Sequence, residues 1–248
     1  MLNTFQILGC SGGVPTQKRG VTCVIISTLD YDIMIDCGEG SYLRWMKAGY
    51  NWRHLEYILI THMHPDHIGG LFPFLFYRKI FNISSPLTLI GPPNLKGYVL
   101  DSFNHAGIML NQDIIFFSNT KKNKISLKGK VKVETMEMKH KIPCWGYAIQ
   151  SGNKKLVFVT DTLRNTNTIE LAQEADVLIH EATFQHAQRD KAKKHFHTTE
   201  IQAMKIADSA KVKRLILTHF SQRLTDTDVK KWIWRGRPCV VFDERQKI

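Results

Sequence analysis

The sequence predicts a layered α/β fold in which helices cover β-sheets. Short apolar runs rich in Ile and Val recur along the chain with turn signals between them, as expected of buried strands. Segments with helical periodicity follow several of these runs. No stretch rich in Pro, Gly or Ser marks a linker, so we expect a single domain over residues 1–248.

The expected elements follow in chain order. Apolar or alternating runs predict strands at residues 5–9, 21–27, 32–37, 56–61, 130–139, 145–151, 155–161, 176–182 and 214–220. Helical patterns occupy residues 41–50, 67–81, 168–175, 198–210 and 226–236. The last three of these segments open with Thr or Asp, which cap the N-termini of helices.

The composition narrows the class of protein. Hydrophobic residues make up 43% of the chain and charged residues 23%, as in ordinary globular proteins. No apolar run approaches the roughly 20 residues that a membrane helix needs, and the first residues do not resemble a secretory signal. The five cysteines are scattered and odd in number, which is typical of a reduced compartment. We therefore expect a soluble, cytoplasmic protein without a membrane partner.

The chain is strongly basic. It has 34 Lys and Arg residues against 22 Asp and Glu residues, a formal net charge of +12. A polyanionic partner explains such an excess, since phosphates attract a basic surface over long distances. A solvated lysine-rich face explains it equally well, and the charge alone does not separate the two.

The stretch THMHPDHIGG at residues 61–70 places three histidines and an aspartate within six positions. His62 and His64 are two positions apart on an extended segment, so both imidazoles point to the same side. Asp66 and His67 then enter a helix and can reach a second ion nearby. Such a cluster predicts a metal site, because a bound cation offsets the repulsion between neighbouring histidines. We also expect the glycines at 69–70 to let the helix pack closely beneath the metals.

Three further candidate ligands follow apolar strands. His140 comes after the alternating run at 130–139, Asp161 ends the run at 155–161, and His219 follows RLILT. Taken singly, each has a simpler reading, namely a surface or hydrogen-bonded histidine or a turn-capping aspartate. Together with the cluster, four strands end in a residue that can bind a metal, and strand ends commonly present functional groups.

A His-x-His-x-Asp-His cluster after an apolar strand, followed by a lone His, an Asp and a terminal His, resembles the signature of the metallo-β-lactamase fold. The resemblance implies an α/β protein with a four-layer αββα sandwich. It also implies two Zn²⁺ ions along one sheet edge, with Mn²⁺ or Fe²⁺ as alternatives. In that pattern one ion is held by His62, His64 and His140, the other by Asp66, His67 and His219, and Asp161 bridges them.

Within this superfamily the chain resembles the tRNase Z (ribonuclease Z) group, endonucleases that trim the 3′ end of precursor tRNA. The resemblance rests on LGCSGGVPTQKRGVT at 8–22, DCGEG at 36–40, HEATF at 180–184, FHTTE at 196–200 and LTHFSQR at 217–223. It implies RNA, including precursor tRNA, as a substrate, and a homodimer. Two features depart from the group. Pro65 stands where glycine is usual, and only residues 141–160 separate the lone histidine from the bridging aspartate, leaving no room for the arm that grips tRNA.

The resemblance also implies a mechanism, in which a metal-bridging hydroxide attacks a phosphodiester and Asp66 orients its proton. His197 is our candidate for the group that protonates the leaving oxygen, and Glu181 is placed to orient it. The alternative for His197 is an ordinary residue at a helix N-terminus. We expect His180 to be structural and four further histidines to lie at the surface: His54, His105, His186 and His195.

Three functions remain open at this point. The first is a phosphodiesterase or endoribonuclease acting on RNA. A run of lysines would then contact the RNA backbone, although a solvated hairpin explains the run as well: Lys121, Lys122, Lys124, Lys128, Lys130 and Lys132. The second is a hydrolase of a small substrate, such as a cyclic nucleotide or other small diester, a sulfate ester, a lactone or a thioester. The third is a non-catalytic, zinc-stabilised nucleic-acid-binding module.

Overall fold

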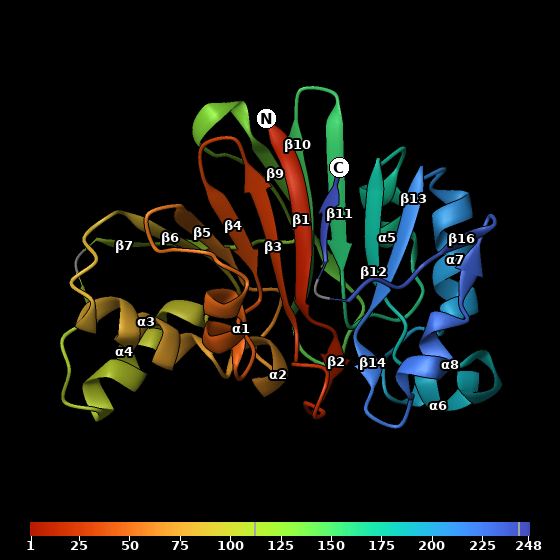
Figure 1. Ribbon diagram of the computed structural model, residues 1–248, viewed down its shortest axis with the longest axis horizontal. Coiled ribbons are helices and arrows are strands. Elements are labelled where there is room, and N and C mark those ends of the chain that lie inside the picture. Colours follow the sequence, from red (N-terminus) through yellow and green to blue (C-terminus); the bar gives the residue numbers. More distant parts are fainter. Residues whose placement is uncertain (112, 243) are drawn as a thin grey trace.

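Two β-sheets lie face to face, and helices cover the outer face of each (Figure 1). The computed structural model describes residues 1–111, 113–242 and 244–248. In this part of the chain the layers follow the order helix, sheet, sheet, helix, so the expected four-layer αββα sandwich is confirmed.

The first sheet has the strand order β17-β1-β3-β4-β5-β6-β7 among the described residues. Its members are β1 (Leu2–Gly9), β3 (Cys23–Thr28), β4 (Asp32–Ile35), β5 (Leu55–Leu59), β6 (Leu87–Gly91), β7 (Ile114–Ser118) and β17 (Arg245–Lys247). Strands β4 to β7 run parallel to one another, whereas β1, β3 and β17 pair antiparallel.

The second sheet has the order β13-β12-β11-β10-β9-β8 in the described residues. Its members are β8 (Lys122–Ser126), β9 (Lys132–Met138), β10 (Cys144–Ser151), β11 (Lys154–Val159), β12 (Val177–Glu181) and β13 (Arg214–Thr218). Strands β11, β12 and β13 are parallel. The short strands β2 (Ser11–Gly12) and β14 (Phe220–Ser221) pair with each other, as do β15 (Ile233–Trp234) and β16 (Arg237–Pro238).

The helices divide between the two outer faces (Figure 1). The first sheet carries α1 (Ser41–Lys47), α2 (Pro65–Ile68), α3 (Leu71–Ile80) and α4 (Leu95–His105). The second sheet carries α5 (Thr166–Ala172) and α7 (Glu200–Ser209), while α6 (Arg189–Lys194) and α8 (Asp226–Lys230) lie beyond the ends of its strands. Two short 3₁₀ helices, η1 (Lys128–Lys130) and η2 (His186–Gln188), lie in connections.

Side-chain alternation along β3 separates two hydrophobic cores. Val24 and Ile26 point towards the second sheet and pack in the same cluster as Phe158. Ile25 lies between them in sequence and points the other way, into the cluster that contains Phe74 of α3. Because successive strand residues face opposite sides of a sheet, one apolar strand fills both cores.

Two predicted helices differ from the structure. The segment 67–81 is broken into α2 and α3, because the chain turns at two successive glycines after Ile68. The segment 226–236 is helical only to Lys230, and the prediction of a helix to residue 236 is wrong. Trp234 instead lies in the β15–β16 hairpin, where its side chain is buried and its Nε1–H donates to Asp208 Oδ1 at 3.2 Å. The tertiary contact therefore overrides the local helical pattern.

A close backbone approach fixes the start of α3 beneath the cluster at 61–70. A Cβ atom on Gly70 would lie 2.1 Å from the carbonyl oxygen of Gly38. On the opposite side of this contact, a Cβ on Gly38 would lie 2.3 Å from the carbonyl oxygen of Asp66. The close packing expected at the second glycine of the pair is confirmed, since only glycine fits against this loop.

None of the helices in the described residues has the length and apolar character needed to cross a membrane. All five cysteines are buried free thiols.

We expect Gly70→Ala to destabilise the fold by about 1–3 kcal/mol, because the added methyl group overlaps backbone atoms that cannot move aside cheaply. The matched control is Gly97→Ala in α4, where an added Cβ meets no atom within 4 Å and should stabilise the helix slightly. Urea unfolding measures both variants. Equal stability of the Gly70 variant and the wild type would contradict the close packing.

Candidate metal centre

Polar side chains gather where parallel strands of both sheets end. His62 follows β5 and Asp161 follows β11, while His219 follows β13. Asp161 and His219 both adopt left-handed backbone conformations, with φ of 45° and 57°. Such conformations are uncommon for residues other than glycine, and they turn these side chains sharply away from their strands.

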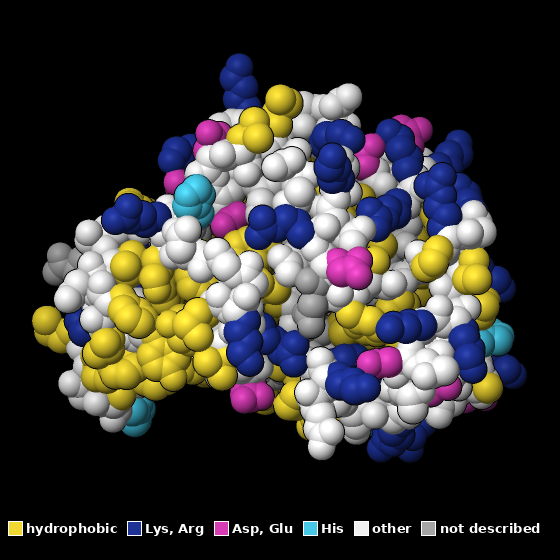
Figure 2. Space-filling model, in the orientation of Figure 1, with side chains coloured by type: hydrophobic (Ala, Val, Ile, Leu, Met, Phe, Trp, Pro, Cys, Tyr) yellow, Lys and Arg dark blue, Asp and Glu magenta, His cyan; other side chains and the backbone are white. Residues whose placement is uncertain are grey.

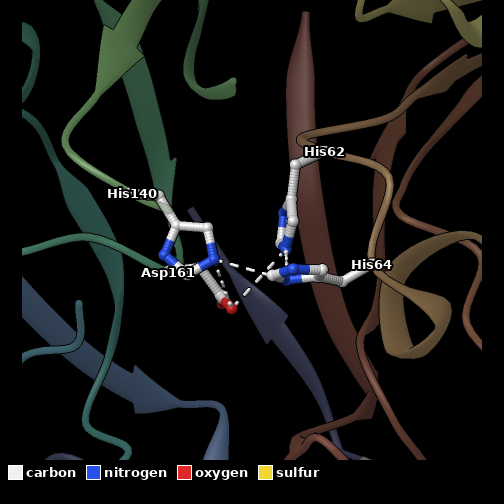
Figure 3. Close-up of side chains that lie close together, drawn as sticks. All are labelled: His62, His64, His140 and Asp161. Atoms are coloured by element: carbon white, nitrogen blue, oxygen red, sulfur yellow. Dashed lines mark hydrogen bonds and ion pairs between the residues drawn. The ribbon is translucent and has the colours of Figure 1, made fainter. Parts of the chain in front are cut away.

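The first group of candidate metal ligands, called the first ligand group below, joins four side chains from both sheets, which point towards one another in Figure 3. His62 Nε2 lies 3.0 Å from His64 Nδ1, and His64 Nδ1 lies 3.3 Å from His140 Nε2. Asp161 Oδ2 is 3.6 Å from His62 Nε2 and 3.8 Å from His140 Nε2. Residues nearly a hundred positions apart thus present their ligand atoms to one small volume.

The second ligand group is Asp66, His67 and His219. Asp66 Oδ2 lies 3.4 Å from His67 Nε2 and 3.2 Å from His219 Nε2, and the two imidazole nitrogens are 3.2 Å apart. The other carboxylate oxygen of Asp161, Oδ1, is 3.5 Å from His67 Nε2 and 3.1 Å from His219 Nε2.

These spacings fit metal ligands. A tetrahedral zinc ion with bonds of about 2.0–2.1 Å places its ligand atoms roughly 3.3 Å apart. Most of the separations in the two groups fall close to that value. Direct hydrogen bonds do not explain both groups, because several nitrogen atoms converge on each volume and a neutral imidazole has only one proton to donate.

The electrostatics of the site also fit bound cations. Burial lowers the pKa of His62 well below its usual value, so this imidazole is neutral and has an electron pair to offer. At His67 burial has the same effect, but the charges of Asp161, Asp36 and Asp66 outweigh it and raise the pKa. Three carboxylates around one buried imidazole create a strongly negative potential, which a divalent cation would offset.

A carboxylate behind the ligands holds His67 in place. Asp36 Oδ2 accepts a hydrogen bond of 2.7 Å from His67 Nδ1, which leaves Nε2 directed at the second ligand group. The Thr61 backbone N–H donates to Asp36 Oδ1 at 2.7 Å, and the Thr61 hydroxyl lies 3.0 Å from His62 Nδ1. Asp36 is fully buried. Such contacts behind metal ligands fix the tautomer and orientation of each ring.

Two further contacts orient ligands. His140 Nδ1 lies 3.3 Å from the carbonyl oxygen of Phe196, so Nδ1 donates and Nε2 faces the first group. The backbone N–H of Gly13 donates to Asp66 Oδ2 at 2.7 Å, which ties the N-terminal glycine loop to the second group.

His197 lies beside the ligands but is held by Glu181. Its Nδ1 is 3.2 Å from both oxygens of Glu181, and Glu181 Oε1 accepts a 2.6 Å bond from the Thr162 backbone N–H. Although burial opposes protonation, the charge of Glu181 and this hydrogen bond raise the pKa of His197 to about 9. The structure therefore brings the two predicted residues together as a pair.

A cavity of about 290 Å³ opens over the ligand groups. Besides ligands and His197, its lining combines one aromatic ring with polar and cationic side chains at the mouth: Phe184, Lys191, His195, Gln222 and Arg223. A site of this size is at the small end of the range for ligand pockets.

The other histidines lie mostly as expected. His180 is buried outside both ligand groups, and its Nδ1 donates to the carbonyl oxygen of Glu181 at 2.8 Å. His54, His105 and His186 are exposed. His195 is exposed too, but it also lines the cavity, a position that sequence reasoning missed.

The sequence patterns also assigned no role to Asp36, Thr61 or Thr183, which contact the candidate ligands from behind. Asp36 could have been noticed, because it lies in DCGEG, one of the stretches that carry the family resemblance. Its role depends on a contact with His67, 31 positions away, which spacing does not reveal.

The family model described as anti-Pycsar protein Apyc1 matches residues 4–233 of the 248-residue chain. The chain belongs to this family. A ribonuclease Z from Enterococcus faecalis is 31% identical to it, over 88% of this chain and 87% of the relative. This member of the Apyc1 family is thus also similar in sequence to ribonuclease Z.

Solved structures with a similar fold identify the fold of the chain. Human tRNase Z, short form, is 27% identical with a TM-score of 0.82, covering 89% of this chain and 93% of that chain. The metallo-β-lactamase fold protein YhfI from Bacillus subtilis is 18% identical with a TM-score of 0.84, covering all of both chains. The chain has the metallo-β-lactamase fold and is a metal-dependent hydrolase similar to ribonuclease Z.

We expect Asp36→Asn to weaken metal binding by about 10–100-fold, because the neutral side chain no longer holds His67 as firmly or adds negative charge behind it. The control is Asp101→Asn, an exposed carboxylate on α4. Competition with a chelator of known affinity measures both. An unchanged affinity in the Asp36 variant would remove this residue from the support of the site.

Proposed function

We propose that the chain is a dinuclear zinc phosphodiesterase whose two metal sites share Asp161. The proposal rests on the position of this carboxylate, whose two oxygen atoms face different ligand groups. Its Oδ2 atom faces His62 and His140, whereas its Oδ1 atom faces His67 and His219. Imidazole-rich ligand sets favour zinc over magnesium or calcium, with Mn²⁺ and Fe²⁺ as the alternatives.

Two divalent cations held in these groups would supply an acidified water and neutralise charge on the phosphoryl oxygens. Asp66 orients the proton of the attacking water, and the Gly13 N–H holds the carboxylate in position. The chain's own contribution is thus to align the water with the phosphorus atom.

His197 donates a proton to the leaving oxygen. Its Nδ1 is occupied by Glu181, so its other nitrogen is available to the cavity that both ligand groups share. Glu181 keeps the imidazole protonated and fixes its orientation. Proton donation of this kind matters most when the leaving alkoxide is a strong base.

Among phosphodiesters, we propose a small substrate, with a cyclic nucleotide favoured. Only the β10–β11 hairpin lies between His140 and Asp161, so an arm for tRNA has no place there. The cavity of about 290 Å³ suits a compact molecule, and exposed Lys191 and Arg223 at its mouth favour an anion.

RNA, including precursor tRNA, is the second candidate. The similarity to proteins named ribonuclease Z supports it. The basic run at 121–132 gives it little support, because three of its six lysines already contact carboxylates: Lys122, Lys124 and Lys128. Lys122 contacts Glu170 and Glu134, and Lys128 contacts Glu56 at 2.7 Å.

A homodimer is also part of the proposal. Figure 2 shows a broad hydrophobic area on the side that carries α1, α3 and α4. Exposed apolar residues of α1 and of α3 and its C-terminal end contribute to it: Leu43, Met46, Tyr77, Ile80 and Phe81. Soluble monomers rarely expose large apolar areas, and a second copy that presents the same face would cover it.

We expect His64→Ala to lose bound metal and to reduce diester hydrolysis to background, since it removes a ligand. His197→Ala should keep its metal but lose about 10²–10⁴-fold in rate, most for poor leaving groups, because it removes the proton donor. The control is His105→Ala, an exposed histidine on α4. Metal analysis and hydrolysis of bis(p-nitrophenyl) phosphate test all three. Full activity in the His64 variant would refute the ligand assignment.

A substrate panel separates the two candidates. We expect hydrolysis of a 3′,5′-cyclic nucleotide to exceed cleavage of precursor tRNA and to change little between 50 and 200 mM salt. An RNA substrate that makes 6–10 phosphate contacts would lose about 10³–10⁵-fold in affinity over that range. Cleavage of the tRNA alone, with this steep salt dependence, would reverse the preference. Light scattering on the same sample reports whether the chain is a dimer.

A further inference from the structure

The hydroxyl group of Thr183 connects a candidate metal ligand with the candidate proton donor. Thr183 lies just after β12 and is buried. Its Oγ1 atom is 2.6 Å from Glu181 Oε2 and 2.9 Å from His219 Nδ1, and it lies 3.4 Å from His197 Nδ1. The rings of His197 and His219 also lie side by side, with centroids 5.5 Å apart, but the Thr183 hydroxyl lies within hydrogen-bond distance of both Glu181 and His219.

The chemistry of the three groups fixes the direction of these bonds. An ionised carboxylate only accepts hydrogen bonds, so the Thr183 hydroxyl donates its single proton to Glu181. Its oxygen then accepts a bond from His219, which requires that Nδ1 carry the proton. The lone pair of His219 therefore resides on Nε2, the atom that lies 3.2 Å from Asp66 Oδ2 and faces the second ligand group.

The backbone of Gly12 limits the His219 ring from another direction. A Cβ atom at Gly12 would lie only 2.6 Å from His219 Nδ1 and 2.7 Å from its Cε1. The glycine loop is thus packed directly against the imidazole. Between this backbone and the Thr183 hydroxyl, the ring has one orientation in which Nε2 points at the ligand group.

We propose that Thr183 is a positioning residue that sets both the tautomer of His219 and the orientation of Glu181, and so aligns the second metal site with the proton donor. This inference rests on the proposed function for the role of His197. The positioning of His219 by Thr183 does not depend on the identity of the substrate, because it affects metal binding alone. One hydroxyl thereby links binding of the cation to the group that acts on the leaving oxygen.

Thr183→Val removes the hydroxyl and keeps the shape of the side chain, whereas Thr183→Ser keeps the hydroxyl. The matched control is Thr218→Val. Thr218 is also buried and adjoins His219, but its Oγ1 has no hydrogen-bond partner among the described residues. Thermal unfolding identifies any variant that does not fold, and Thr183→Ala is a second hydroxyl-free variant for that case.

We expect Thr183→Val to bind metal at the second ligand group about 10–100-fold less tightly in chelator competition. At saturating metal, its rate should fall about tenfold more for an alkyl ester than for a p-nitrophenyl ester, because the proton donor is misaligned. Thr183→Ser should restore both properties, and Thr218→Val should match the wild type in both.

Unchanged metal affinity and leaving-group dependence in folded Thr183→Val would overturn the proposal, as would a serine variant that restores neither property. A role in packing alone would lower the unfolding temperature without moving either readout. If the wild type hydrolyses no phosphodiester while the valine variant still binds metal more weakly, the hold on His219 survives and the proposed function fails.

Discussion

The arrangement of this protein depends on a buried row of imidazoles and carboxylates that lies between the ends of two sheets. Such groups are costly to remove from water unless a partner of opposite charge compensates them. The neutral imidazole of His62 and the strongly negative surroundings of His67 are both consistent with cations at these positions. The left-handed backbone at Asp161 and His219 is a further local cost that convergence of the ligands imposes.

The packing of the sandwich serves this convergence. Tyr147 on β10 of the second sheet donates its hydroxyl proton to the carbonyl oxygen of Ile60 at 2.6 Å, just before the first histidine. The backbone N–H of Trp145 donates to the carbonyl oxygen of Thr61 at 3.0 Å. These bonds tie the loop after β5 directly to the opposite sheet, so ligands from the two sheets keep their relative positions. The hydrogen bonds that hold the two sheets together therefore also fix the geometry of the site.

Sequence patterns predicted many of the strands and part of the candidate metal site. Apolar runs located strands such as Cys23–Thr28 and Leu55–Leu59, because buried strands need continuous hydrophobic residues. Four ligand candidates were visible from local spacing, since an extended segment followed by a helix determines where their side chains point. His140, Asp161 and His219 were weak candidates singly and gained their roles through resemblance to a family. The helix expected at 226–236 ended early because Trp234 packs against α7.

The supporting residues were beyond the reach of local patterns. Asp36 and Thr183 act through side chains that are distant in sequence, so only the folded arrangement identifies their partners. The same holds for the cavity, whose lining comes from the glycine loop, from HEATF and from the segment after β13. In the proposed function, substrate choice depends on that lining, whereas the chemistry depends on the candidate ligand groups.

The central claim is that two cations lie side by side and share one carboxylate. Anomalous scattering from crystals of the purified protein, recorded at the absorption edge of the bound metal, tests it most directly. The account predicts two peaks about 3.5–4 Å apart, one on each side of Asp161. A single peak, or two peaks that do not flank Asp161, would contradict it.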